Sequence, residues 1–130
     1  MKVEQAYLGT LLKENHLIKD SSLKEFHFEE NRHKQLFKHM KDLTTAGQSV
    51  DVVTLSVQVD IQAIGGVSYL NEIITYANAE KVDEYGQLVV DAWKEREKRN
   101  ILEIARNENW EIGKVIKSLD DINEVKTDDH

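Results

Sequence analysis

The sequence has 130 residues, a formal net charge of −7 at pH 7, no cysteine and no proline. This length is enough for one domain with a single hydrophobic core, and the missing cysteines exclude disulfides and thiolate metal sites. Proteins that grip nucleic acid are normally basic, so we expect this chain to bind protein, with direct nucleic-acid binding a minor role at most. No apolar run reaches membrane-spanning length and the N-terminus is not typical of a signal peptide, which favours a cytoplasmic protein with no membrane partner.

Three amphipathic segments open the chain. The first helix is predicted from apolar residues that recur at helical spacing, at Val3, Ala6, Tyr7, Thr10 and Leu11. A short irregular or helical connection follows, over residues 17–28, with Leu23, Phe26 and Phe28 as anchors. A further helix then buries Leu36, Phe37, Met40 and Leu43, and the residues from Thr44 to Ser49 form a loop.

The stretch from Val50 to Val59 is ambiguous. Valine and leucine alternate there with polar residues, which is typical of a strand. However, no other stretch offers a strand partner, and a lone strand leaves its backbone groups unpaired. Asp51 is also a good N-cap for a helix that begins at Val52. We therefore predict a helix.

After a break at Gly65 and Gly66, two more helices are predicted. The first buries Val67, Leu70, Ile73, Ile74 and Ala77. The second runs from Val82 to Ala105, and its apolar stripe consists of Val82, Tyr85, Leu88, Val89, Ala92, Trp93, Ile101, Ile104 and Ala105. Between Lys94 and Arg99 this helix is polar on all sides, as expected where a helix crosses solvent between two packed bodies. Its cations Lys94, Arg96, Lys98 and Arg99 alternate with glutamates, and we interpret them as a solvated, self-paired face.

A last short helix, marked by Ile112, Val115, Ile116, Leu119 and Ile122, follows a break at residues 107–109. It must fold back on the end of the long helix, because neither could bury its stripe alone. The predicted fold is therefore all-α, a compact helical bundle joined by a long helix to a C-terminal helical hairpin. Its parts are a globular subdomain over residues 1–79, the connecting helix over 80–106, the hairpin over 100–124, and a disordered tail over 125–130.

The sequence contains no recognisable catalytic constellation. Gly113 and Lys114 lack the upstream glycine and the hydroxyl of a phosphate-binding loop, so we expect no ATPase activity and no cofactor in this chain. No two of the five histidines, at 16, 27, 33, 39 and 130, have the four-residue spacing that aims two imidazoles at one metal. We expect them at the surface or at its boundary, with no metal site. Trp93 is expected to close the main core, whereas Trp110 fits either hairpin packing or a partner contact.

Several stretches, in this order and spacing, resemble one family. They are Glu4-Gln5-Ala6-Tyr7-Leu8-Gly9, Phe28, His33-Lys34, Leu36-Phe37, SVDVVTLS at 49–56, GGVSYL at 65–70 and VDEYGQLVVD at 82–91. Together they are similar to the N-terminal domain of bacterial replicative DNA helicases of the DnaB type, including phage-encoded relatives. The resemblance covers residues 3–122, and it implies that the ambiguous stretch at 50–59 is helical.

The resemblance implies a collar role. In such a helicase the globules and hairpins form a collar of paired subunits on a hexameric ring of ATPase domains, and primase and helicase loaders dock on the collar. ATP and magnesium belong to the ring domain, which is absent from this chain, and DNA is contacted through the parent protein. Two alternatives remain open from the residues, namely a freestanding adaptor that binds a replicative helicase or primase, and a helical DNA-binding domain.

The predicted interaction surface is the hairpin. When the apolar stripe of one hairpin packs against the same stripe of a second subunit, the two form a twofold-symmetric contact. We expect seven residues to divide between packing inside the hairpin and such a contact, namely Ile101, Ile104, Trp110, Ile112, Val115, Ile116 and Leu119.

Overall fold

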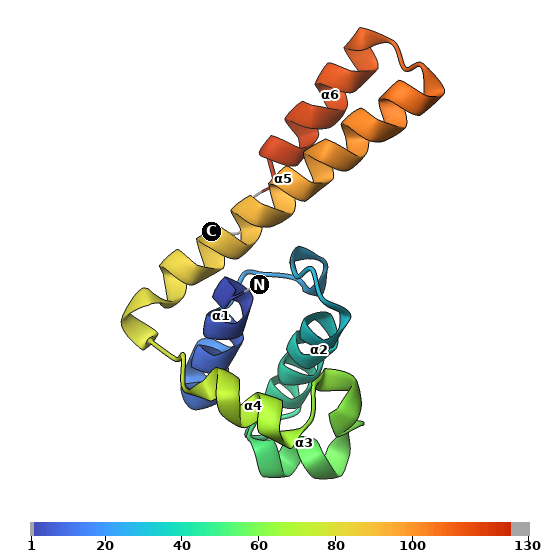
Figure 1. The fold of residues 1–130 in the computed structure, drawn as a ribbon. Coiled ribbons are helices and arrows are strands. Elements are labelled where there is room, and N and C mark those ends of the chain that lie inside the picture. Colours follow the sequence, from blue (N-terminus) through green and yellow to red (C-terminus); the bar gives the residue numbers. More distant parts are fainter. Residues whose placement is uncertain (1, 126–130) are drawn as a thin grey trace.

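The computed structural model describes residues 2–125, and in that range the chain forms helices and no strand. The α-helices are α1 (Lys2–Lys13), α2 (Asn31–Thr45), α3 (Val52–Gln58), α4 (Val67–Ile74), α5 (Val82–Glu108) and α6 (Ile112–Asn123). Short 3-10 turns connect them, namely η1 (Asn15–Leu17), η2 (Glu25–His27), η3 (Ile61–Ile64) and η4 (Ala79–Lys81). Figure 1 shows a globule of α1 to α4 from which α5 projects, with α6 folded back along its far half. The predicted all-α class and architecture are confirmed.

Helix α1 is the central helix of the globule, in contact with α2, α4 and α5. Tyr7 and Leu11 of its predicted face lie in the core, and Leu8 beside them is buried too. Gly9 lies so close to α4 that an added Cβ would sit 1.9 Å from the carbonyl oxygen of Ile73. Any side chain at this position would collide with the backbone of α4, so the tight α1–α4 packing requires glycine.

The ambiguous stretch is helical, as predicted. The Asp51 carboxylate accepts a hydrogen bond from the Thr54 backbone N–H at 2.7 Å and caps α3. Leu55 is the buried anchor of this helix, whereas Val53 and Val57 are exposed. The alternating valines therefore do not mark two faces of a sheet, because Leu55 fixes α3 to the globule with Val52 packed beside it against the core.

Two histidines lie in the interior, so their predicted position at the surface or its boundary is wrong. His33 and Glu4 are fully buried, and His33 Nδ1 lies 2.7 Å from Glu4 Oε1. The other ring nitrogen of His33 lies 2.5 Å from the hydroxyl of Tyr69, and the second Glu4 oxygen accepts from the Glu29 N–H at 2.9 Å. This network joins α1, α2 and α4, and it satisfies the polar groups that burial would otherwise leave unpaired. The second buried histidine, His27, lies at the base of α5.

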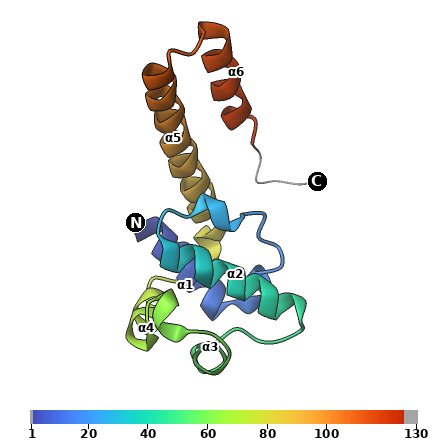
Figure 2. The same ribbon diagram turned by 90° about the vertical axis from the view of Figure 1, so that its right-hand side faces the viewer.

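Helix α5 leaves the globule after Val89 and Val90, which are buried, and continues as a stalk (Figures 1 and 2). Leu88, predicted in the buried stripe, is exposed instead. The predicted tail, apart from the half-buried Val125, lies outside the described residues. Within residues 2–125, no helix has both the length and the apolar character needed to cross a lipid bilayer.

Candidate functional site

The hairpin turn is built from the residues that end α5. Asn109 adopts the left-handed conformation with a φ of 55°, which small polar side chains tolerate and which ends the helix. The backbone N–H of the next residue, Trp110, donates to the carbonyl of Ala105 at 3.0 Å. The Lys114 ammonium lies 3.9 Å from the centre of the Trp110 ring, and the indole N–H donates to Glu108 at 3.2 Å. These contacts hold Trp110 at the tip of the hairpin, half-buried.

The seven predicted interface residues fall into two groups. Ile101, Trp110, Val115 and Leu119 are half-buried, whereas Ile104, Ile112 and Ile116 are exposed. Ile112 is 76% exposed and Ile116 is 54% exposed, so two helices leave much of the α6 stripe in water. The gaps of four and three that separate Ile112, Ile116 and Leu119 place them along one stripe of α6.

Sequence reasoning missed Leu102, which is 50% exposed on α5. Leu102 precedes Ala105 of the predicted stripe by three residues, so its spacing was the signal that could have found it. It adds to the apolar surface that the two helices of the arm leave in water.

The base of the arm is an aromatic joint between η2 and α5. His27 contacts Phe26, with ring centres 4.4 Å apart, and Trp93, at 5.1 Å in an edge-on geometry, and the Phe26 and Trp93 rings are themselves 5.2 Å apart. The Arg96 guanidinium donates to the backbone carbonyl of His27 at 3.0 Å, which ties the stalk to the globule. Next to Trp93, the Lys94 ammonium donates to the Asn123 carbonyl at 3.3 Å and so ties the last turn of α6 to α5.

His27 is held neutral in this joint. Its Nδ1 accepts from the Lys24 backbone N–H at 2.9 Å, and its Nε2 is buried with no hydrogen-bond partner among the described residues. Burial lowers the pKa of His27 to about 4, with the positive charges of Lys24, Lys94 and Arg96 acting in the same direction. The joint is therefore apolar inside and cationic around its edge.

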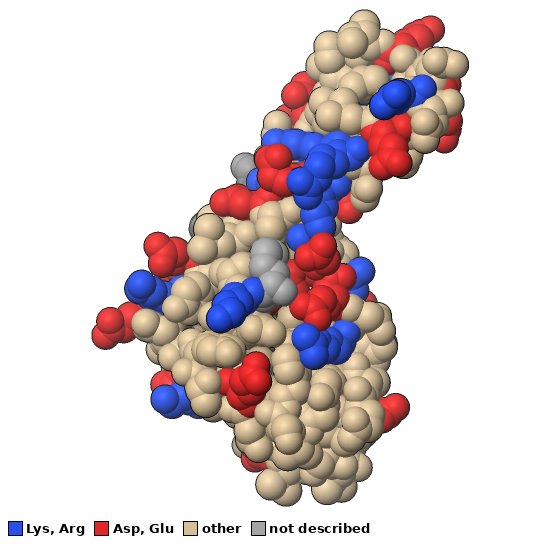
Figure 3. Space-filling view, viewed as in Figure 1, with Lys and Arg blue, Asp and Glu red and all other residues tan. Residues whose placement is uncertain are grey.

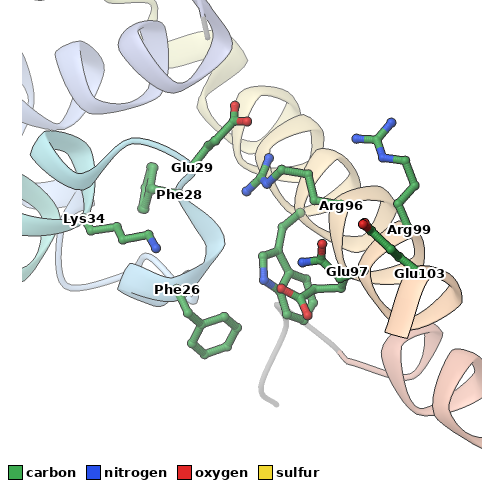
Figure 4. A pocket seen from close by; sticks show the side chains of 10 residues that line it. Phe26, Phe28, Glu29, Lys34, Arg96, Glu97, Arg99 and Glu103 are labelled. Carbon is green, nitrogen blue, oxygen red and sulfur yellow. The ribbon is translucent and has the colours of Figure 1, made fainter. Parts of the chain in front are cut away.

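A hollow of about 450 Å³ opens beside the joint. Figure 4 shows side chains from the η2–α2 region on one wall and from α5 on the other. Its lining residues are Phe26, Phe28, Glu29, Lys34, Trp93, Arg96, Glu97, Arg99, Asn100 and Glu103. Among residues 2–125, no group of three or more histidine, aspartate or glutamate side chains is placed to hold a metal ion.

Residues 1–91 match the family described as "DnaB-like helicase N terminal domain". The chain belongs to this family. The match takes in the globule and the first part of α5, and the motifs at 4–9, 49–56, 65–70 and 82–91 lie within it. A search of curated proteins found no match.

Solved structures extend the DnaB likeness to the hairpin. One is titled "The Structure Of A DnaB-Like Replicative Helicase And Its Interactions With Primase", and it is 31% identical with a TM-score of 0.78 over 98% of this chain. This chain spans only 32% of that one, about a third of its length. A second, the N-terminal domain of DnaB helicase from Mycobacterium tuberculosis, is 22% identical with a TM-score of 0.78 and shares the fold over 95% of this chain and 96% of its own.

Proposed function

We propose that this chain is the N-terminal collar domain of a replicative hexameric DNA helicase that works in the cytoplasm. In this role the hairpins pair subunits, and the collar docks primase and the helicase loader. Membership of the DnaB-like family supports the role, as does the similarity to a replicative helicase whose title names interactions with primase. The parent protein would hydrolyse ATP with magnesium in a separate ring domain, and this chain would itself be no enzyme.

The observation that carries the pairing proposal is the exposed apolar stripe of α6. Ile112 and Ile116 are exposed on a two-helix arm, and no third element among residues 2–125 covers them. Burying an isoleucine side chain contributes about 1.5–3 kcal/mol, so the arm lacks this stabilisation while both side chains stay exposed. A second hairpin related by a twofold axis would place the stripe against its own copy and recover that energy.

Sedimentation velocity over a range of protein concentrations tests the pairing. Ile112→Glu and Ile116→Glu should each weaken self-association, because a charge would enter the apolar contact without a partner. Val57→Glu is the matched control, since Val57 is 79% exposed on α3, away from the hairpin. Equal masses for the wild type and all three variants at the highest concentration would show that the stripe does not pair subunits.

Primase docking is tested separately by calorimetric titration of this chain with the primase encoded in the same genome. Binding with normal affinity to the Ile112→Glu variant would separate docking from pairing, whereas no heat with the wild type would contradict docking on this domain. A phosphate-binding loop in the coding sequence downstream of His130 would distinguish a helicase from a freestanding adaptor.

A further inference from the structure

The stretch from residue 42 to residue 80 contains no lysine, arginine or histidine, although the whole chain has 17 lysine and arginine residues and five histidines. It includes α3, η3 and α4, which lie at the end of the globule opposite the arm (Figures 1 and 2). Figure 3 shows no lysine or arginine over α3. The charged residues that α3, η3 and α4 and their connections contribute to this end are therefore all acidic.

Helix α3 presents apolar side chains to solvent at this end. Val53 is 72% exposed and Val57 is 79% exposed, and their spacing of four residues places them next to each other on one face of the helix. Leu55, on the other side of the helix, is fully buried in the core. We call the exposed side of α3 with its two valines the valine face.

The stability of the fold does not explain the valine face. Val53 and Val57 lie in water and take no part in the core. Residues branched at Cβ are also weaker helix formers than alanine, glutamate or lysine, because their side chains lose rotamer freedom in a helix. A different residue at either position would favour α3 more, so the two valines fit a contact outside this chain better than a role within it.

Two carboxylates flank the valine face. Asp51 caps the start of α3 and accepts from the Thr54 N–H at 2.7 Å. Asp60 follows the end of the helix and accepts from the Gln62 N–H at 3.2 Å. Both carboxylates are exposed, and neither forms an ion pair with any residue in the range 2–125. The hydrogen bond from Thr54 lowers the pKa of Asp51, so this carboxylate stays negative at neutral pH.

We propose that the valine face docks a helix of another protein, one whose apolar side is flanked by two cations. Helix α3 has seven residues and is about 10 Å long, and a partner helix with lysine or arginine at positions i and i+7 spans the same distance. Apolar residues at i+3 and i+4 of that helix would pack on Val53 and Val57, while its cations meet Asp51 and Asp60.

The charge at this end argues against other classes of occupant. Nucleic acids and anionic lipid surfaces have the same sign of charge as Asp51 and Asp60 and would be repelled. A second copy that packed its α3 antiparallel on this one would bring Asp51 of each chain close to Asp60 of the other. A cationic partner helix meets neither obstacle. Subunit pairing uses the arm at the opposite end, so this docking surface is additional to the pairing contact of the proposed collar role.

Nuclear magnetic resonance of the isotope-labelled whole chain tests the proposal with two synthetic helical peptides. Both peptides carry leucine at positions i+3 and i+4, and the residues at i and i+7 are lysine in one peptide and glutamate in the other. The lysine peptide should shift the amide signals of residues 51–60 most and bind about tenfold more tightly or better than the glutamate peptide. Added salt should narrow this difference, because the charges are exposed.

The charges are tested by Asp51→Asn/Asp60→Asn. Asparagine keeps a side-chain oxygen that can cap a helix, so α3 should stay folded while both negative charges are lost. The variant should bind the lysine and glutamate peptides with equal affinity. Unchanged preference for the lysine peptide would contradict the assigned role of the two carboxylates.

The apolar contact is tested by Val53→Thr/Val57→Thr, which keeps the shape of both side chains and replaces a methyl group with a hydroxyl in each. This variant should bind the lysine peptide about tenfold more weakly, because the valine face becomes polar. Ile112→Thr/Ile116→Thr is the matched control, since it places threonine at two exposed apolar positions of α6, and it should bind as the wild type does.

Three results would overturn the proposal. The first is a set of shifted signals that lies in the arm instead of residues 51–60. The second is equal binding of the two peptides to the wild-type chain. The third is a dependence of the α3 signals on protein concentration without any peptide, which would assign the valine face to a second copy of this chain.

Discussion

The globule and the hairpin arm are built from the same kind of amphipathic helix, yet they bury their apolar residues to different degrees. In the globule α1 is enclosed by three other helices, and residues such as Leu8 are inaccessible to solvent. In the arm, among residues 100–125, only Ala105 and Ile122 are buried. Two helices share a single contact face, so their other faces remain in water. Stability is therefore concentrated in the globule, and apolar surface free for recognition is concentrated in the arm.

The largest expected loss of stability comes from disrupting the close contact between α1 and α4 in the globule, which has no counterpart in the arm. Gly9→Ala should destabilise the fold by about 3 kcal/mol or more, because its methyl group would overlap the backbone of α4, which cannot move aside cheaply. Gly113→Ala in α6 is the counterpart in the arm, where an added Cβ meets nothing within 4 Å. It should be neutral or stabilising by up to about 1 kcal/mol, because alanine favours helix over glycine. Urea unfolding of both variants gives the comparison, and similar losses would contradict it.

The next effect acts at the joint between the two regions. Since the pKa of His27 is lowered to about 4 in the folded protein and is near 6.5 when unfolded, the unfolded state binds more protons between these values. Stability is fully present above pH 6.5 and falls as the pH drops toward 4, by about 3 kcal/mol from this group. His27→Asn keeps an acceptor for the Lys24 N–H and removes the titration. Urea unfolding should show that the free energy of unfolding falls less steeply with decreasing pH in the variant than in the wild type. Parallel pH profiles of the two proteins would show that His27 is not a buried neutral imidazole.

The smallest effect compares helix caps. Asp51→Ala should cost about 1 kcal/mol, because the carboxylate caps α3 through the Thr54 N–H. Glu111 occupies the same position before α6 and makes no side-chain capping bond, so Glu111→Ala should change the free energy of unfolding by less than about 0.5 kcal/mol. Thermal unfolding followed by circular dichroism measures both. A larger loss for Glu111→Ala would show that the first turn of the arm depends on that side chain.

The candidate site was partly predictable. The spacing of Ile112, Ile116 and Leu119 located the apolar stripe of the arm. Ile112 and Ile116 are exposed because the arm consists of only two helices. Leu102 was missed, although its gap of three to Ala105 is the spacing of the stripe. The hollow beside the joint could not be predicted, since its two walls, from the η2–α2 region and from α5, meet only after the chain folds back on itself.

The sequence by itself determined where the helices form and where several of them end. Asp51 caps α3 and Asn109 turns the chain between α5 and α6, and both effects depend on hydrogen bonds and backbone preferences within a few residues. Tertiary structure alone decided burial. His33 is buried because Glu4, 29 residues away, provides a partner for it, and His27 is enclosed by a stalk whose Arg96 reaches back over 69 residues. A helix fixes which side chains share a face, but contact with a distant element decides whether that face meets protein or water.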